Sequence, residues 1–127
     1  MPIITTIRGN TSPFGKRVMI TATGGVITYS GAYKVHTFTT IGSDTFVANA
    51  GGTVEYLVIA GGAGGGSAHA GGGGGAGGFR TGSLLINSGN ISIGVGSGGS
   101  GRDASAAIGG QGQNSLFSTI TSLTTSI

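Results

Sequence analysis

The chain has 127 residues, of which 30 are glycine and 37% are hydrophobic. Its formal charge of +3 comes from six Lys or Arg against three Asp or Glu, so it reflects a shortage of acids. This composition excludes collagen, which needs proline between its glycines, and a disordered chain, which combines low hydrophobicity with high charge. The cations form no dense stripe with aromatic residues, which argues against nucleic-acid binding. There is no cysteine for a disulfide or thiolate metal site, and no apolar run approaches the roughly 20 residues of a membrane insertion.

Residues 1–20 are predicted to form an irregular N-terminal docking arm, followed by one glycine-rich β domain over residues 21–127. The arm begins with a strand-like apolar run, and a turn follows it. Terminal segments are commonly frayed and solvated, but a free tail has no need of apolar side chains next to cations. The candidate docking residues are Ile3, Ile4, Ile7, Arg8, Lys16 and Arg17. We expect residues 1–16 of this arm to contribute little to the fold of the domain itself.

From residue 18 onward the hydrophobic pattern has a period of two, which indicates β-strands. In the segment 33–39, His36 and Phe38 share one face. The run 53–60 is the most apolar and is predicted to be a central strand. The expected strands cover residues 26–29, 33–39, 45–48, 53–60, 83–86, 90–95 and 115–120. This pattern predicts an all-β fold, an antiparallel β-sandwich-like domain with long glycine-rich loops.

The glycine-rich stretch over residues 61–78 is much longer than an ordinary loop, so it is either functional or disordered. Because glycine lacks a Cβ, extended segments with three residues per turn, like polyproline II, could lie side by side and hydrogen-bond laterally. Residues 94–101 and 109–112 could supply partners in such polyglycine packing. We expect the stretch to be ordered and laterally packed, and we expect valine at Gly73 or Gly75 to clash.

The sequence offers no catalytic or cofactor constellation. Matches such as Gly72-x-Gly74-x-x-Gly77 arise by chance in a glycine run, and neither a helix former nor a suitably placed acid follows them. The acids are isolated in the sequence, and the two histidines lack a third ligand signal. We therefore expect no enzyme activity, no cofactor and no metal.

Three side chains near the glycine runs are candidates for partner binding: His69, Arg80 and Arg102. Loops that carry His, Arg or aromatic groups on a rigid backbone can bind sugars or proteins. Phe79, in contrast, is expected to begin a strand and to plug the core.

Several segments resemble a known family. Thr21-Ala-Thr-Gly-Gly-Val-Ile-Thr, Gly31-Ala-Tyr-Lys-Val-His-Thr-Phe-Thr and Val54-Glu-Tyr-Leu-Val-Ile-Ala-Gly-Gly are similar to the glycine-rich domain of bacteriophage virion proteins, notably tail fibres and adhesins. Thr45-Phe-Val, Gly73-Gly-Gly-Ala-Gly-Gly-Phe-Arg-Thr-Gly82 and Gly110-Gln-Gly-Gln-Asn-Ser-Leu-Phe117 look like further signatures of it. The resemblance covers about residues 21–117.

The resemblance implies a virion structural protein of the tail-fibre or receptor-binding type. Its partners would be other virion proteins and a host-surface glycan or protein, and the trimeric state of fibre proteins would be expected for a homo-oligomer. The chain ends soon after the Ser-Leu-Phe segment, where family members commonly carry another glycine run, which favours a small accessory virion protein. One alternative is a head decoration or cement protein docked through the N-terminal arm. Another is an ice-binding or matrix protein of stacked glycine helices, which needs regular Gly-x-x repeats that the irregular spacing here disfavours.

Overall fold

The computed structural model describes residues 6–7, 10–11, 17–18, 20–67, 71–102, 108–118 and 120–121, and every regular element among them is a β-strand. The strands are β1 (Thr6–Ile7), β2 (Asn10–Thr11), β3 (Arg17–Val18), β4 (Ala22–Thr23), β5 (Val26–Ser30), β6 (Tyr33–Thr37), β7 (Gly42–Ala48), β8 (Gly52–Ile59), β9 (Phe79–Ile86), β10 (Gly89–Val95), β11 (Leu116–Phe117) and β12 (Ile120–Thr121). The predicted all-β class is confirmed, and the longer strands lie close to their predicted positions.

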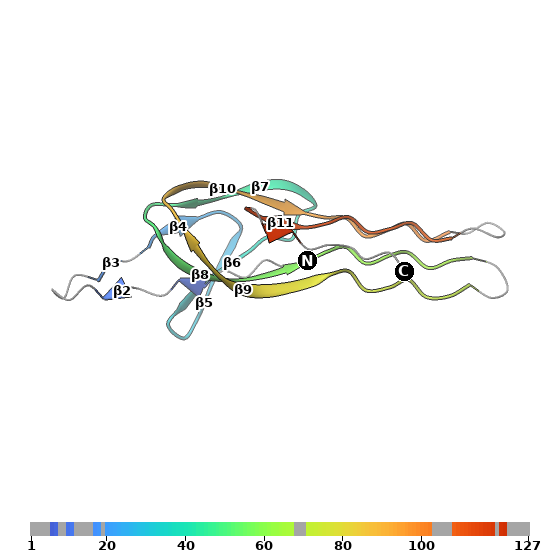
Figure 1. The fold of residues 1–127 in the computed structure, drawn as a ribbon, viewed down its shortest axis with the longest axis horizontal. Coiled ribbons are helices and arrows are strands. Elements are labelled where there is room, and N and C mark those ends of the chain that lie inside the picture. The colour runs from blue at the N-terminus through green and yellow to red at the C-terminus, as the bar shows by residue number, and fades with distance from the viewer. Residues whose placement is uncertain are drawn as a thin grey trace.

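Two antiparallel sheets face each other across a hydrophobic core (Figure 1). One has the strand order β1-β8-β9, so the apolar strand β8 is its centre, as the sequence predicts. The other has the order β12-β11-β10-β7-β4, in which β7 and β10 pair along their whole length. Both sheets also pair strands that are far apart in the chain, namely β1 with β8, β4 with β7 and β7 with β10. The longer strands alternate between a buried and an exposed face, as expected for half-buried antiparallel sheets.

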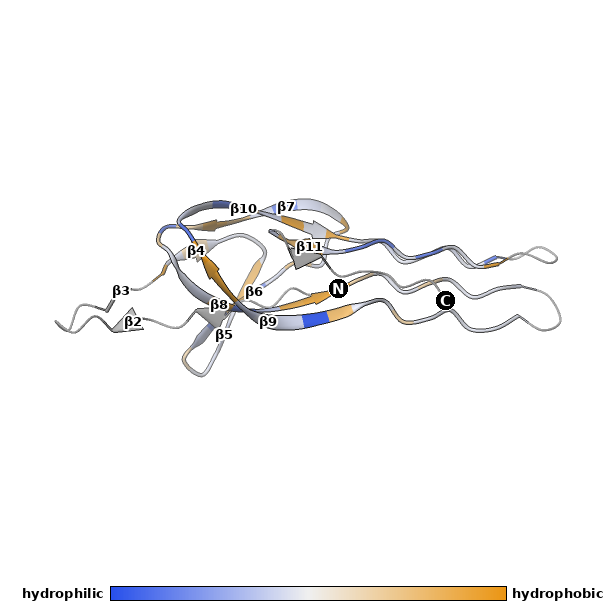
Figure 2. Ribbon diagram, in the orientation of Figure 1, coloured by the Kyte–Doolittle hydropathy of each residue, from blue (hydrophilic) through white to orange (hydrophobic). Residues whose placement is uncertain are grey.

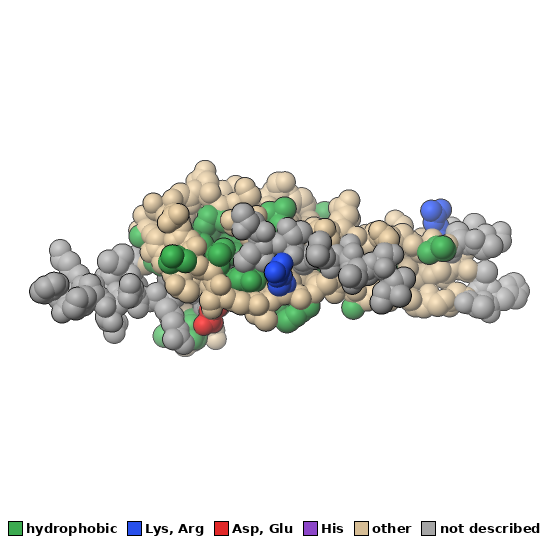
Figure 3. Space-filling model, viewed as in Figure 1, with side chains coloured by type: hydrophobic (Ala, Val, Ile, Leu, Met, Phe, Trp, Pro, Cys, Tyr) green, Lys and Arg blue, Asp and Glu red, His purple; other side chains and the backbone are tan. Residues whose placement is uncertain are grey.

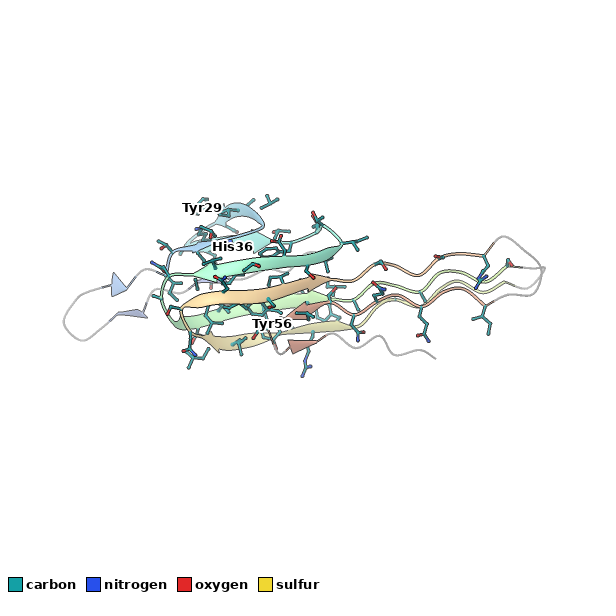
Figure 4. The ribbon with its side chains drawn as sticks, turned by 90° about the horizontal axis from the view of Figure 1, so that it is seen from above. Tyr29, His36 and Tyr56 are labelled. Carbon is teal, nitrogen blue, oxygen red and sulfur yellow. The ribbon has the colours of Figure 1, made fainter. Side chains whose placement is uncertain are left out.

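The core is filled mainly by aromatic and β-branched side chains. Phe46 of β7 and Phe117 of β11 are fully buried and meet edge to face, with ring centroids 6.3 Å apart. Tyr56 of β8, labelled in Figure 4, is in contact with Phe117 of the other sheet, with ring centroids 6.0 Å apart. Figure 2 shows the apolar residues concentrated on the strands of the sandwich. The other buried core members are Ile20, Ala22, Phe38, Ala48, Val54, Val58, Ile86, Ile93 and Val95.

Strands β5 and β6 form a separate two-stranded hairpin, connected by a turn at Gly31 and Ala32. His36 of β6 points into the protein and is fully buried, and Phe38 just beyond the strand is buried on the same face, as the alternation predicts. Every residue of β5 is exposed.

The N-terminal segment is partly joined to the domain. In β1, Thr6 and Ile7 pair with Glu55 and Val54 at the edge of the three-stranded sheet, and Ile20 is a core residue. The expectation that residues 1–16 add little to the fold therefore needs correction at Thr6 and Ile7. The docking role itself stays a prediction.

Candidate functional site

Four extended segments leave one end of the sandwich together and form a rod, which we call the glycine arm (Figure 1). The first segment continues β8 outward and the second returns into β9; the third continues β10 outward and the fourth returns into β11. The described parts of the four segments are residues 60–67, 71–78, 96–102 and 108–115.

The first segment is the centre of the arm, because its backbone is hydrogen-bonded to each of the other three. In each triplet of residues, one N–H donates to the second segment, the next N–H donates to the fourth, and the third residue's carbonyl accepts from the third segment. These bonds are Ala60 N to Gly78 O, Ala63 N to Gly75 O, Gly66 N to Gly72 O, Gly61 N to Gln113 O, Gly64 N to Gly110 O, Gly99 N to Gly62 O and Arg102 N to Gly65 O, with N···O distances of 2.8 to 3.3 Å.

This period of three is that of a polyproline II helix, whose backbone groups point outward in three directions and have no internal partner. The expected lateral packing of residues 61–78 is thus confirmed over 61–67 and 71–78. The fourth segment closes the network by bonding to the third, through Gly110 N to Ser100 O and Gln113 N to Ser97 O, both at 2.8 Å.

One glycine in each triplet lies against the backbone of a neighbouring segment. A Cβ on any of these glycines would come within 3.0 Å of backbone atoms, so no larger residue fits unless the segments separate. The positions are Gly61, Gly64, Gly74, Gly77, Gly96, Gly99, Gly109 and Gly112.

Gly73 and Gly75 are different, because a Cβ on either would have no heavy atom within 4 Å. The expected clash at these two positions is therefore wrong. The stretch does have tight positions, and they are Gly74 and Gly77.

Side chains project outward from the arm (Figure 4), and several of the larger residues recur in the sequence with the same spacing of three. Along the fourth segment Ile108, Gln111 and Asn114 are exposed, and Ile108 is 91% exposed. Ser97 and Ser100 repeat in the same way on the third segment. Within each segment the spacing is thus regular, unlike the irregular glycine spacing that was used against the ice-binding alternative. The row of outward-facing residues on each segment was not predicted, although their spacing of three is visible in the sequence.

The arm also connects the two sheets through backbone hydrogen bonds. Its first two segments extend the β8–β9 hairpin, and its last two extend the β10–β11 hairpin. Gly61 and Gly64 of the first hairpin donate to the second. In the sandwich the sheets meet through side chains, whereas in the arm the same two hairpins share a hydrogen-bonded lattice.

The predicted partner-binding residues are not brought together. Arg80 is exposed in β9 opposite Val58, at the base of the arm, whereas Arg102 is exposed beside Gly65 toward its far end. Seven residues separate these two levels, or roughly 20 Å at the rise of an extended threefold helix. His69 lies outside the described residues.

Phe79 does begin β9, but it does not plug the core. It is 66% exposed and pairs with Ile59 on the outer face of the sheet.

Of the predicted docking residues, Ile3, Ile4, Arg8 and Lys16 lie outside the described residues. The backbones of Ile7 and Arg17 belong to β1 and β3. Their placement in two different sheets does not identify a docking surface.

His36 is a buried titratable group whose pKa departs from its ordinary value. Burial lowers the pKa of His36, the nearby charge of Lys34 lowers it further, and a 2.8 Å hydrogen bond between Nδ1 and Gly24 O opposes them. Its Nε2 is buried without a hydrogen-bond partner among the described residues, and its ring meets Phe46 edge to face at 5.0 Å. This is the setting of a neutral core histidine.

No group of three or more His, Cys, Asp or Glu side chains that could hold a metal occurs in the described parts of the chain. Asp44 of β7 accepts a hydrogen bond from the neighbouring Thr45 N at 2.7 Å. Figure 3 shows few charged side chains on the viewed face. Over the same residues, no helix is long and apolar enough to cross a membrane.

Residues 37–126 match the family model described as "Glycine-rich domain", which spans most of the sandwich and all of the arm's segments. The chain therefore belongs to the glycine-rich domain family. Neither a curated protein nor a solved structure shows significant similarity to it.

Proposed function

We propose that the chain is a non-catalytic structural and binding component of a bacteriophage virion, of the tail-fibre or receptor-binding type. The observation that supports this most is the glycine arm. A lattice bonded in three directions is a stiff rod, because moving one segment breaks bonds to several neighbours. Such a rod is suited to hold a contact surface away from the body of a particle.

The outer surface of the arm fits a polar partner. Its ridges carry amides and hydroxyls from Gln111, Asn114, Ser97 and Ser100, with the guanidinium of Arg102 near the far end. The serine and asparagine side chains are short and lose little entropy on binding, and the rigid backbone that carries all of these groups is already ordered, which suits a host-surface glycan or protein. The sandwich and the N-terminal segment would then face the other virion proteins.

The test is to locate the chain on intact particles. Antibody against the sandwich, seen by cryo-electron microscopy, should label the tail or its fibres. Purified wild-type protein should also compete with particles for adsorption to host cells, and a variant with Arg102→Ala and Gln111→Ala should compete less. Labelling of the head would favour the decoration or cement alternative, and absence from purified virions would refute the proposal.

The ice-binding alternative gains one supporting observation, the threefold repeat of the stacked segments. Residues three apart are separated by about 9 Å along such a segment. In the described parts of the arm, this repeat is formed by two residues on one segment, Ser97 and Ser100, and by three on another, Ile108, Gln111 and Asn114. Thermal hysteresis of the purified protein would decide for this alternative; its absence together with virion labelling would remove it.

A further inference from the structure

The hairpin of β5 and β6 leaves one strand uncovered. All five residues of β5 are exposed, with Val26 at 63% and Tyr29 at 76%. Among the described elements, β6 is the one against which β5 packs extensively, and Tyr29 points away from the sandwich in Figure 4. A two-stranded ribbon alone is marginally stable. Proteins usually protect an apolar edge with Lys, Pro or a bulge, and β5 has neither Lys nor Pro.

The register of the hairpin determines which backbone groups of β5 are unused. Ser30 pairs with Tyr33 across a two-residue turn, and Gly31 has a φ of 58°, as the first central position of a type II′ turn requires. The pair beside such a turn exchanges both hydrogen bonds, and successive pairs alternate. The even-numbered residues of β5 therefore bond to β6. Ile27 and Tyr29 direct their N–H and C=O groups to the free edge.

We propose that this edge pairs with β5 of a second copy of the chain, antiparallel, about a twofold axis at Thr28. In this register Ile27 of each copy lies opposite Tyr29 of the other, so the outward backbone groups of both residues are all satisfied. Thr28 lies opposite Thr28. The side-chain pairs are aromatic with β-branched and Thr with Thr, which are both favourable across strands.

Other antiparallel registers are poorer. A shift by one residue places the outward groups of one copy opposite residues whose backbone groups already bond to β6. A shift by two leaves one of the outward residues in each copy without a partner. The strand is thus self-complementary in one register, which is the requirement for an isologous twofold interface.

One short strand from each copy makes a small interface, below the size of a standard stable complex. We therefore expect weak association in solution, at sub-millimolar concentration, that becomes strong where copies are held close together. This twofold pair differs from the trimer that resemblance to fibre proteins implies, and the mass of the assembly distinguishes them.

A cysteine placed on the axis tests the register, because the chain has no cysteine of its own. Facing residues that are not hydrogen-bonded to each other have Cα atoms about 4.5 Å apart, within the range of a disulfide. Mild oxidation of Thr28→Cys should give a covalent dimer on a non-reducing gel. Val26→Cys is the matched control, since Val26 is exposed on the same face, but its two copies would lie about 13 Å apart.

Charge substitutions at the same position test the association without a covalent bond. Thr28→Lys and Thr28→Glu should each abolish the dimer seen by sedimentation equilibrium, because like charges meet on the axis. A mixture of the two variants should restore it. Equal cross-linking of the two cysteine variants, no cross-linking of Thr28→Cys, or a wild-type protein that stays monomeric at sub-millimolar concentration would each overturn the proposal. The last two outcomes are also those expected if β5 pairs with a strand of a different protein.

Discussion

Adding a single methyl group at Gly74 is expected to open the glycine arm, whereas the same change at Gly73 or Gly75 is expected to be harmless. A Cβ on Gly74 would lie 2.9 Å from the carbonyl carbon of Gly64 and closer still to Ala63 O. Both contacts are with backbone, which cannot rotate away as a side chain can. The second segment must therefore move away from the first.

The size of the effect follows from the bonds on either side of Gly74. Ala63 N to Gly75 O, at 2.9 Å, and Gly66 N to Gly72 O, at 3.1 Å, hold this part of the second segment in place. Each bond is worth about 1 kcal/mol net, so Gly74→Ala should destabilise the arm locally by about 2 kcal/mol. That corresponds to a roughly 30-fold faster exchange of these amides if they exchange by local opening.

Hydrogen exchange followed by mass spectrometry measures this effect separately for the arm and the sandwich. Gly74→Ala should accelerate exchange over residues 60–67 and leave exchange in β7 and β10 unchanged. Gly73→Ala and Gly75→Ala are the matched controls: they face open space, and neither has a positive φ. They should leave exchange unchanged or slow it slightly, because alanine lowers the entropy of the unfolded chain.

The reasoning would be refuted if the three variants behaved alike. If all three variants were neutral, the space beside Gly74 would have to be large enough for a Cβ. If all three accelerated exchange equally, the loss of glycine itself would matter, and the difference between tight and open positions would have no effect on stability.

Three further outcomes follow from the sandwich. Burial lowers the pKa of His36 below its ordinary value of 6.5, so the unfolded state binds the proton more tightly than the folded state. The free energy of unfolding should therefore be constant with respect to this group above about pH 6.5. It should fall below that pH by at most about 1.4 kcal/mol per pH unit. Urea unfolding across this range should show the slope in wild type, and His36→Phe should reduce it. Phe79→Ser should change the urea midpoint little, since the ring is exposed, whereas Phe117→Ala should cost about 3–5 kcal/mol. Deleting residues 1–16 removes β1 from β8 and should lower stability by about 1–2 kcal/mol; unchanged thermal unfolding would show that β1 adds nothing.

The strands could be predicted because their period of two is strong and turn residues separate them. The same alternation places His36 and Phe38 on one buried face. The alternation also indicates that Phe79 is exposed, because Phe79 is an even number of residues from the exposed Thr81 and Leu85 and an odd number from the buried Ile86. The prediction that Phe79 fills the core was wrong because it gave the aromatic character of the residue more weight than its position in the strand.

The sequence predicts that the glycine segments pack side by side, but it does not predict which glycine of each triplet faces a neighbouring segment. Which glycine of each triplet turns inward depends on the lateral partners, and those are fixed by the two hairpins that begin far apart in the sequence. Gly74 is tight only because the carbonyl of Ala63 lies beside it. Likewise, the pairing of β1 with β8 could not be derived from a two-residue strand whose partner is in the middle of the chain.

The hydrogen-bonded lattice of the arm has a consequence for how such proteins can change in length. The pairing of β8 with β9 continues into the first two segments without a slip, since Ile59 faces Phe79 and Ala60 N bonds to Gly78 O. Inserting one residue into one segment would rotate everything beyond it by about a third of a turn. Side chains that face outward would then point at a neighbouring backbone, and glycines that face a neighbouring segment would turn to the surface. To lengthen the arm without losing any hydrogen bond, three residues must be added to each of the four segments at the same time. Relatives with longer arms should therefore differ in length by whole turns of all four segments.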